Sequence, residues 1–230
     1  MVSSPATHRR TRRPPVREWL RRAGREAWPA IVIVLVCTFL QFGGAAMRHA
    51  LRYDRGKVLA GQWWRLVTAN FIHSSWAHLG LDLSGFVLLW LLFGAILGVR
   101  RFWVATAVGA LAVGLGVFLF SPGVFWFDGI SGVLHTYWAA GALLAVYRRE
   151  WGGRWLLAFL ILKLTYERLF GPLPTSHWAI GGPILTIAHL YGAIAGTLLG
   201  ILWIALDRRR DRRQARAAAP VPSAPVGDHP

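Results

Sequence analysis

Residues 183–206 read PILTIAHLYGAIAGTLLGILWIAL, and this stretch decides the fold class. It exceeds the roughly 20 apolar residues that a helix needs to cross the hydrocarbon core of a bilayer. Because backbone groups in lipid must hydrogen-bond within their own segment, we expect a transmembrane helix. Its glycines, Gly192, Gly196 and Gly200, recur at every fourth position and leave one bare face, which can approach a neighbouring helix closely.

Apolar segments of this kind recur along the chain, whose 230 residues are 55% hydrophobic. A soluble domain of this size would not need apolar runs of such length. We therefore predict an all-α, polytopic membrane protein with a bundle of six transmembrane helices. The six segments are residues 29–47, 79–99, 102–120, 130–147, 155–166 and 183–206, of which the fifth is the shortest.

Positive charge gives the orientation of these helices. The formal net charge is +16, and most of it lies in the two ends of the chain and in two short loops, after the second and the fourth segment. Six crossings place these four basic regions on one side, which the positive-inside rule identifies as the cytoplasm. The loop of residues 48–65 is also basic and opposes this assignment, but only an even number of crossings explains both basic ends.

The predicted organisation has three parts. Residues 1–28 form a basic cytoplasmic tail, residues 29–206 form the membrane domain, and residues 207–230 form a second cytoplasmic tail that is first basic and then rich in Ala and Pro. Such a composition favours disorder in the last part. We expect a bacterial inner (plasma) membrane protein that crosses the membrane several times.

The basic, apolar composition fits two further classes of protein less well. A nucleic-acid-binding protein would carry its arginines on a folded face among aromatic residues, and here they lie in tails and loops, so we expect no nucleic acid partner. The basic start followed by an apolar run also resembles a signal peptide, but the long run and the poor cleavage context at Met47 favour an uncleaved anchor. The single cysteine, Cys37, lies in an apolar run with no metal-ligand neighbours.

Polar groups inside membrane segments are costly and are therefore functional candidates. Ser131 lies at the outer start of the fourth segment, and His189 lies near the outer start of the sixth. With a rise of about 1.5 Å per residue, both fall within roughly 10 Å of the outer boundary. Gly129 and Gly132 flank the serine, and Gly192 lies on the same helix face as His189, so the two side chains can meet as nucleophile and base.

Each of these two residues also has a purely structural interpretation. A serine followed by a glycine at a helix start is commonly a cap or a packing contact, and an isolated intramembrane histidine commonly bonds a neighbouring helix. The matched depth of Ser131 and His189, beside the glycine face, is the argument for a catalytic pair. The free N–H groups at the start of the fourth segment could then stabilise an oxyanion.

Three sequence blocks resemble the rhomboid intramembrane proteases. Residues 129–132, GISG, match the nucleophile motif G-x-S-G of that family, and residues 188–196, AHLYGAIAG, match its motif A-H-x-x-G-x-x-x-G. Residues 61–68, GQWWRLVT, followed by His73 and His78, are similar to the segment that leads from the first outer loop into the second helix. The three blocks stand in the order of the family.

The resemblance implies a Ser131–His189 dyad with no obligatory acid, no cofactor and no metal. It also implies that His78 donates a hydrogen bond in the oxyanion hole. The next contributor is normally Asn, but this chain has Asp82. An ionised carboxylate would repel an oxyanion, so either Asp82 is protonated by burial, or it orients His78, or the hole is built differently, or activity is impaired. His135 falls where the family often has a Tyr packed on the catalytic histidine, and it could equally be a packed polar residue.

A narrower resemblance is to the rhombosortase branch. Residues 131–135, SGVLH, and residues 163–171, KLTYERLFG, carry it. That branch is associated with exported proteins that end in a Gly-Gly sorting tail. Lys163 and Glu167 share one helix face at a spacing of four, and the alternative is that both extend to the outer surface.

Together the motifs predict an intramembrane serine endopeptidase that cleaves membrane-anchored exported proteins near the outer face. Its expected partners are transmembrane or C-terminally anchored substrates and membrane lipid. Water must reach the site, and the outer loop of residues 171–183, with Trp178, could border the access route or be an ordinary connector. A catalytically inactive rhomboid-like protein that binds membrane clients is the main alternative, supported by Asp82. A transporter would need a continuous polar stripe, which the segments at residues 102–120 and 183–206 lack.

Overall fold

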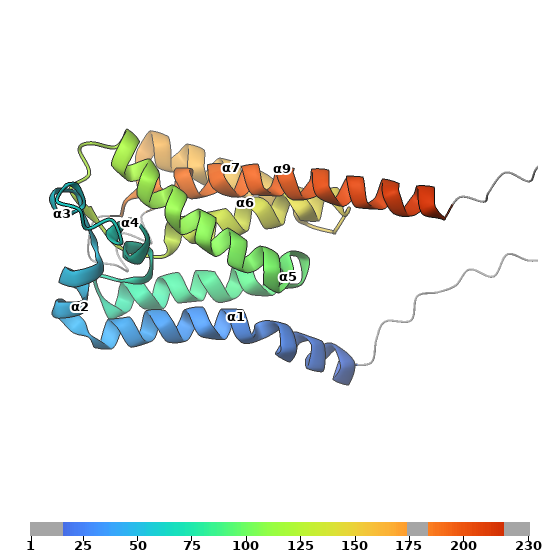
Figure 1. Ribbon diagram of the computed structural model, residues 1–230, viewed down its shortest axis with the longest axis horizontal. Coiled ribbons are helices and arrows are strands. Elements are labelled where there is room, and N and C mark those ends of the chain that lie inside the picture. The colour runs from blue at the N-terminus through green and yellow to red at the C-terminus, as the bar shows by residue number, and fades with distance from the viewer. Residues whose placement is uncertain (1–15, 174–183, 219–230) are drawn as a thin grey trace, which may run out of the picture.

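The structure is a computed structural model that describes residues 16–173 and 184–218, with residues 16–26 described by their backbone alone. The chain forms an elongated helical bundle with one small sheet at one end (Figure 1). The elements in chain order are α1 (Val16–Phe42), α2 (Gly44–Leu51), β1 (Tyr53–Asp54), α3 (Arg55–Leu59), α4 (Arg65–Thr68), η1 (Ala69–Phe71), α5 (Trp76–Phe120), β2 (Trp126–Phe127), α6 (Ser131–Tyr147), α7 (Gly153–Phe170) and α9 (Thr186–Ala217).

Helix α5 is a helical hairpin rather than one straight helix. The chain reverses at Gly98, where φ is 65° and ψ is 169°, a left-handed backbone that glycine adopts at little cost (Figure 1). Residues 76–97 form the first arm of α5 and residues 99–120 form the second. These arms correspond to the expected segments 79–99 and 102–120, although the break falls at Gly98 and not at the arginine pair that follows it.

Two other expected boundaries were wrong. The segment 29–47 does not stay straight, because α1 ends at Phe42 and the chain bends by 113° into α2. Gly44, with φ of 58°, permits that bend. The segment 155–166 is too short, since α7 spans 18 residues and continues past Lys163 and Glu167, the charges that end the apolar run in the sequence.

Length and composition mark two of the described helices, α5 and α9, as candidate membrane spans, or three when the bent pair of α1 and α2 is counted as one span. Helix α6 has only 17 residues, and α7 carries several charges. The surface of the bundle is nonetheless apolar. Exposed aliphatic and aromatic residues occur on α1, α5, α7 and α9, for example Phe39, Leu91, Ile161 and Leu198, and they suit a lipid environment.

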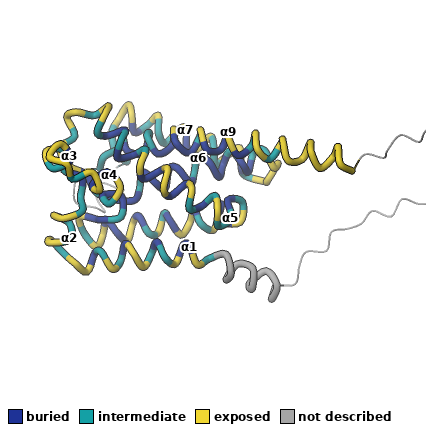
Figure 2. The backbone as a smooth tube through the Cα atoms, viewed as in Figure 1, coloured by how far each residue is buried: buried dark blue, intermediate teal, exposed yellow. Residues whose placement is uncertain are grey.

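Helix α6 lies at the centre of the bundle and is buried along most of its length (Figure 2). Its most extensive contact is with α9, followed by the arms of α5. The contact between α6 and α9 depends on small residues. A Cβ atom at Gly192 would collide with the carbonyl oxygen of Gly132, and one at Gly196 would collide with the carbonyl oxygen of Thr136. The glycine face expected from the sequence is therefore the surface on which α9 approaches α6.

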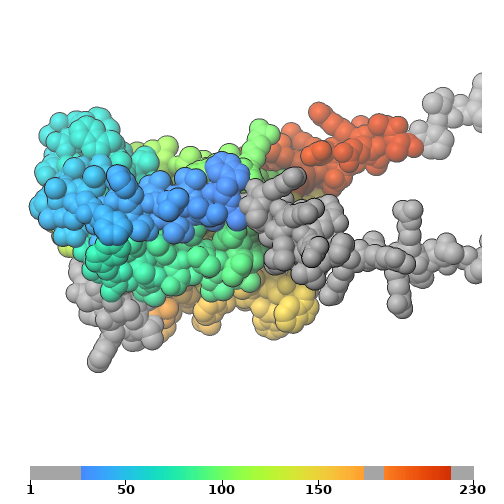
Figure 3. All heavy atoms as spheres, turned by 90° about the horizontal axis from the view of Figure 1, so that it is seen from below, coloured from blue at the N-terminus to red at the C-terminus, as the bar shows by residue number. Residues whose placement is uncertain are grey.

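Helix α1 packs along α5, and the short elements α2, α3 and α4 gather at one end of the bundle (Figure 3). At that end β1 pairs antiparallel with β2, with Tyr53 opposite Phe127. The expectation of an all-α protein missed this two-stranded sheet, because strands of two residues leave no periodic pattern in the sequence.

The opposite end of the bundle carries the start of α1 and the end of α9 (Figure 1). There Asp207 of α9 pairs with Arg101 of the second arm of α5 and lies 3.9 Å from Arg148 at the end of α6. The described ends of the chain therefore lie on the same side, as an even number of passes requires. Residues 1–15 of the first expected tail, residues 219–230 of the second, and residues 174–183 of the outer loop, with Trp178, lie outside the described residues. The expected boundary at residue 206 was wrong, because α9 continues to Ala217.

Candidate active site

The first turn of α6 presents Ser131 at the end of a loop that is held from two sides. The pairing of β1 with β2 fixes the chain just before this loop, and the N–H of Gly129 donates to the carbonyl oxygen of Ala69 at 3.1 Å. Gly129 has φ of +114°, and a Cβ atom there would lie 2.7 Å from Nε2 of His78. Only glycine fits this position, so the backbone that leads into the serine has one conformation.

His189, in the first turn of α9, meets Ser131 directly. Its Nε2 lies 2.9 Å from the Oγ atom of Ser131, and the side chain of His189 is 6% exposed. No side chain caps the first turn of α6, so the N–H groups next to the serine keep their donor capacity. The two groups that the sequence placed at matched depth thus stand within hydrogen-bond distance.

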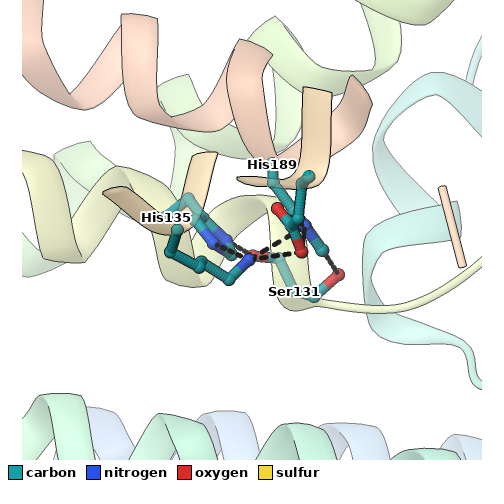
Figure 4. Close-up of polar contacts among 5 residues, drawn as sticks. Ser131, His135 and His189 are labelled. Carbon is teal, nitrogen blue, oxygen red and sulfur yellow. Dashed lines mark hydrogen bonds and ion pairs between the residues drawn. The ribbon is translucent and has the colours of Figure 1, made fainter. Parts of the chain in front are cut away.

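Three further side chains, from Glu167, His135 and Lys163, contact the imidazole of His189 (Figure 4). Glu167 of α7 is buried, and its Oε2 atom lies 2.9 Å from Nδ1 of His189. His135, one turn after the serine, stacks on the ring of His189 with centroids 4.2 Å apart and planes inclined by 14°. Its own Nδ1 donates to the carbonyl oxygen of Ser131 at 2.7 Å.

Lys163 lies in the middle of this group. Its Nζ atom is 2.7 Å from Nε2 of His135, 2.8 Å from Oε1 of Glu167 and 3.1 Å from Nδ1 of His189. The two histidines and the glutamate have the spacing of a metal-binding triad. The ammonium of Lys163 occupies the position between them, so a divalent ion would have to displace it.

A second buried cluster lies in the first arm of α5 and the loops beside it. Oδ2 of Asp82 is 3.2 Å from Nε2 of His73 and 3.4 Å from Nε2 of His78, yet the angles leave that oxygen without a hydrogen bond among the described residues. Nδ1 of His78 lies 2.9 Å from Oγ of Ser74 and 3.6 Å from Oδ1 of Asp128. The Asp82 carboxylate therefore lies where it can orient His78, which is one of the interpretations left open by the sequence.

The two clusters face one cavity of about 420 Å³. Its polar wall holds Ser131 and His189 from one cluster and His78 and Asp82 from the other. Its remaining walls are apolar and come from the first arm of α5 and from α6 and α7, with Leu88, Leu134, Trp138 and Phe159 among the residues. Ser131 therefore lies in the wall of a mainly apolar cavity.

Comparison with known proteins assigns the family. Residues 60–206, more than half of the chain, match the Rhomboid domain. The chain belongs to the rhomboid family. Members of this family are generally intramembrane serine proteases, and the matched range contains each candidate site residue of this rhomboid protein. It is also similar to "Putative rhomboid protease YdcA" of Bacillus subtilis (strain 168), at 26% identity over 158 residues, which cover 69% of this chain and 75% of that protein.

The sequence placed Ser131, His189, His78, Asp82 and His135 among the candidate site residues, but it left open whether Lys163 and Glu167 turn inward. Lys163 and Glu167 do not extend to the outer surface, because their side chains are only 12% and 4% exposed and point into the bundle. The dyad expected from the resemblance therefore has a carboxylate beside it. The signal was present in the sequence as a Lys–Glu pair at a spacing of four, but the spacing alone does not say which face of α7 turns inward.

Proposed function

We propose that this rhomboid protein is an intramembrane serine endopeptidase in which Ser131 is the nucleophile and His189 is the general base. The observation that carries the proposal is the 2.9 Å contact between Oγ of Ser131 and Nε2 of His189. A serine hydroxyl is a weak nucleophile until a neighbouring base accepts its proton. The contact lies in a cavity with apolar walls, where a membrane-anchored peptide can bind.

The proposed reaction is acyl transfer. His189 accepts the proton of Ser131 while Oγ bonds to the scissile carbonyl carbon, and the N–H of Ser131 and the imidazole of His78 donate to the oxyanion. The protonated His189 then gives its proton to the leaving amine as the C–N bond breaks. A water molecule then attacks the acyl-enzyme and gives a proton to His189. His189 passes this proton to Oγ of Ser131 as the ester bond breaks, and the acid product leaves.

We place the protein in the bacterial inner membrane with six crossings and both termini in the cytoplasm. This count takes the two arms of α5 separately and adds α1, α6, α7 and α9, of which α6 and α7 are shorter or more polar than the candidate spans α5 and α9. Arg101 and Arg148, which lie beside Asp207, are at the end of the bundle where α1 begins and α9 ends. Basic residues at this end agree with the positive-inside rule. The catalytic pair then lies toward the outer face.

For the substrate we propose an exported protein with a C-terminal tail of a Gly-Gly motif, an apolar helix and a basic end. The support is the sequence resemblance to the rhombosortase branch in residues 131–135 and 163–171. A glycine pair has no side chains, so such a tail can unwind and enter the cavity beside Ser131 as an extended chain.

Co-expression with a Gly-Gly-tailed reporter tests both statements. The wild type should release the reporter from the membrane, and Ser131→Ala and His189→Ala should each leave it anchored. Unchanged release with both variants would refute the protease. Cleavage of a reporter whose glycines are replaced by leucine, at the wild-type rate, would refute the substrate class alone. An inactive client-binding protein would retain the reporter without cleaving it.

A further inference from the structure

Lys163 fixes the proton positions around the catalytic pair, and the donor and acceptor capacities of its neighbours show how. The carbonyl oxygen of Ser131 can only accept, so Nδ1 of His135 carries the hydrogen in their 2.7 Å contact. Nε2 of His135 is then an acceptor, and the ammonium of Lys163, which can only donate, binds it at 2.7 Å. The same ammonium donates to Oε1 of Glu167 at 2.8 Å. His135 is therefore held as one neutral tautomer.

The same reasoning applies to His189, whose Nδ1 lies between a carboxylate and an ammonium. An ionised carboxylate can only accept, so the 2.9 Å contact with Oε2 of Glu167 requires a hydrogen on Nδ1. That tautomer leaves Nε2 free to accept the proton of Ser131. If Nδ1 instead accepted from Lys163 at 3.1 Å, the hydrogen would sit on Nε2, and His189 could not act as the base.

We propose that Glu167 is a positioning residue that completes a Ser–His–Glu triad, and that Lys163 is the cation that holds this carboxylate and the stacked His135 in place. This inference rests on the proposed protease function and deepens it. During the reaction the proton of Ser131 moves to Nε2 of His189 and then to the leaving amine. Glu167 stays ionised, and the hydrogen on Nδ1 stays on His189.

Glu167 and Lys163 act on His189 with opposite signs. When His189 accepts the proton of Ser131 it becomes a cation, which the carboxylate 2.9 Å away stabilises and the ammonium 3.1 Å away destabilises. The groups that face His189 are Ser131 and His135 from α6, and Lys163 and Glu167 from α7. From the opposite wall of the cavity, α5 contributes His78 and Asp82, which remain unchanged in the variants below.

The test measures kcat and KM against pH for cleavage of a Gly-Gly-tailed reporter by the full chain in detergent or vesicles. Glu167→Gln should lower kcat by about 10²–10³-fold with KM changed less than about threefold, because the tautomer and the imidazolium lose their support. The acidic limb of its rate profile should move to lower pH. Lys163→Met should move that limb to higher pH, by about one unit. If Glu167 and Lys163 had only structural roles, the two substitutions would not move the acidic limb of the pH profile in opposite directions.

Two exposed residues provide controls of matched charge change. Arg168→Gln on α7 and Glu150→Gln in the turn before α7 should leave kcat and the pH profile as in the wild type. The double variant Lys163→Met/Glu167→Gln removes the ion pair without leaving a buried charge unpaired. The acidic limb of its pH profile should return toward that of the wild type, while kcat stays low. If Glu167→Gln does not fold, this double variant tests the role of Glu167.

The outcomes separate this inference from the proposed function. If Ser131→Ala abolishes cleavage while Glu167→Gln, or the double variant, keeps the wild-type kcat and pH profile, Ser131 and His189 act alone and the proposed triad is wrong. If both single variants shift the profile in the same direction, the assigned proton positions are wrong. If Ser131→Ala still cleaves the reporter, the protease function itself fails.

Discussion

Replacing Gly192 by alanine tests how closely α6 and α9 must approach for the proposed catalytic pair, Ser131 and His189, to form. The added Cβ atom would collide with the carbonyl oxygen of Gly132 and would lie 3.3 Å from Oγ1 of Thr136. The oxygen belongs to the backbone of α6 and cannot rotate away, so relief requires α9 to move by roughly 1 Å. His189 lies one turn before Gly192 on the same helix, and the displacement would lengthen its 2.9 Å contact with Ser131.

The size of the effect follows from opposing contributions. Forcing an extra methyl group into a packed interface costs about 1–3 kcal/mol, and a collision with backbone belongs at the upper end. Alanine gains about 1 kcal/mol over glycine in a helix, which leaves a net loss of roughly 2 kcal/mol. For a chain of this size that lowers the unfolding midpoint by roughly 4–8 °C. A misplacement of about 1 Å at the reacting atoms reduces kcat by about 10²-fold.

The assay is reporter cleavage together with thermal unfolding of the same detergent-solubilised samples. Gly80→Ala is the matched control, since Gly80 lies in the first arm of α5, is exposed, and has no atom within 4 Å of an added Cβ. Gly200→Ala should be intermediate, because its nearest neighbour is the movable side chain of Leu143 at 3.0 Å. Wild-type kcat and stability in Gly192→Ala would refute the claim that the glycine face sets the catalytic distance.

Three further substitutions have definite expected results. Asp82→Asn should reduce cleavage by more than about tenfold, because an amide does not replace the carboxylate beside His78. Cleavage within about tenfold of the wild type, measured with the same reporter, would show instead that a neutral donor is sufficient at this position. Gly129→Ala should reduce kcat by at least about tenfold, because alanine strains a backbone at φ of +114° and its Cβ atom collides with His78. An unchanged rate would contradict the claim that this position must be glycine. Asn70→Ala should lower stability by about 1–3 kcal/mol, because Nδ2 of Asn70 donates to the carbonyl oxygens of Leu66 and Ala110, and a denaturation midpoint equal to that of the wild type would count against this.

The sequence predicted the helical membrane bundle because its strongest signals are long and local. The apolar run that contains His189 is uninterrupted, and its glycines have a regular spacing, so both the helix and its contact face could be derived. The bend after Phe42 and the reversal at Gly98 were harder to predict from the sequence. Each depends on one glycine with positive φ, and a glycine in a membrane segment can equally mark close packing.

The catalytic pair could be proposed from depth and motif, but its surroundings could not. Lys163 and Glu167 are charged residues near the end of an apolar segment, and such residues often extend to the membrane surface. Only the packing of α7 on α6 shows that they turn inward and contact His189. The contact of Asp82 with His73 and His78 is equally invisible in the sequence, since it depends on how η1 and the loop after it fold back on α5.

Covalent labelling with a fluorophosphonate probe tests the central claim most directly, because the probe reacts with a serine hydroxyl only when a base activates it. Intact mass and peptide mapping should find one adduct on Ser131 in the wild type and none in Ser131→Ala or His189→Ala. A wild-type chain that stays unlabelled, or a His189→Ala chain labelled on Ser131 at the wild-type rate, would contradict the assignment of His189 as the base.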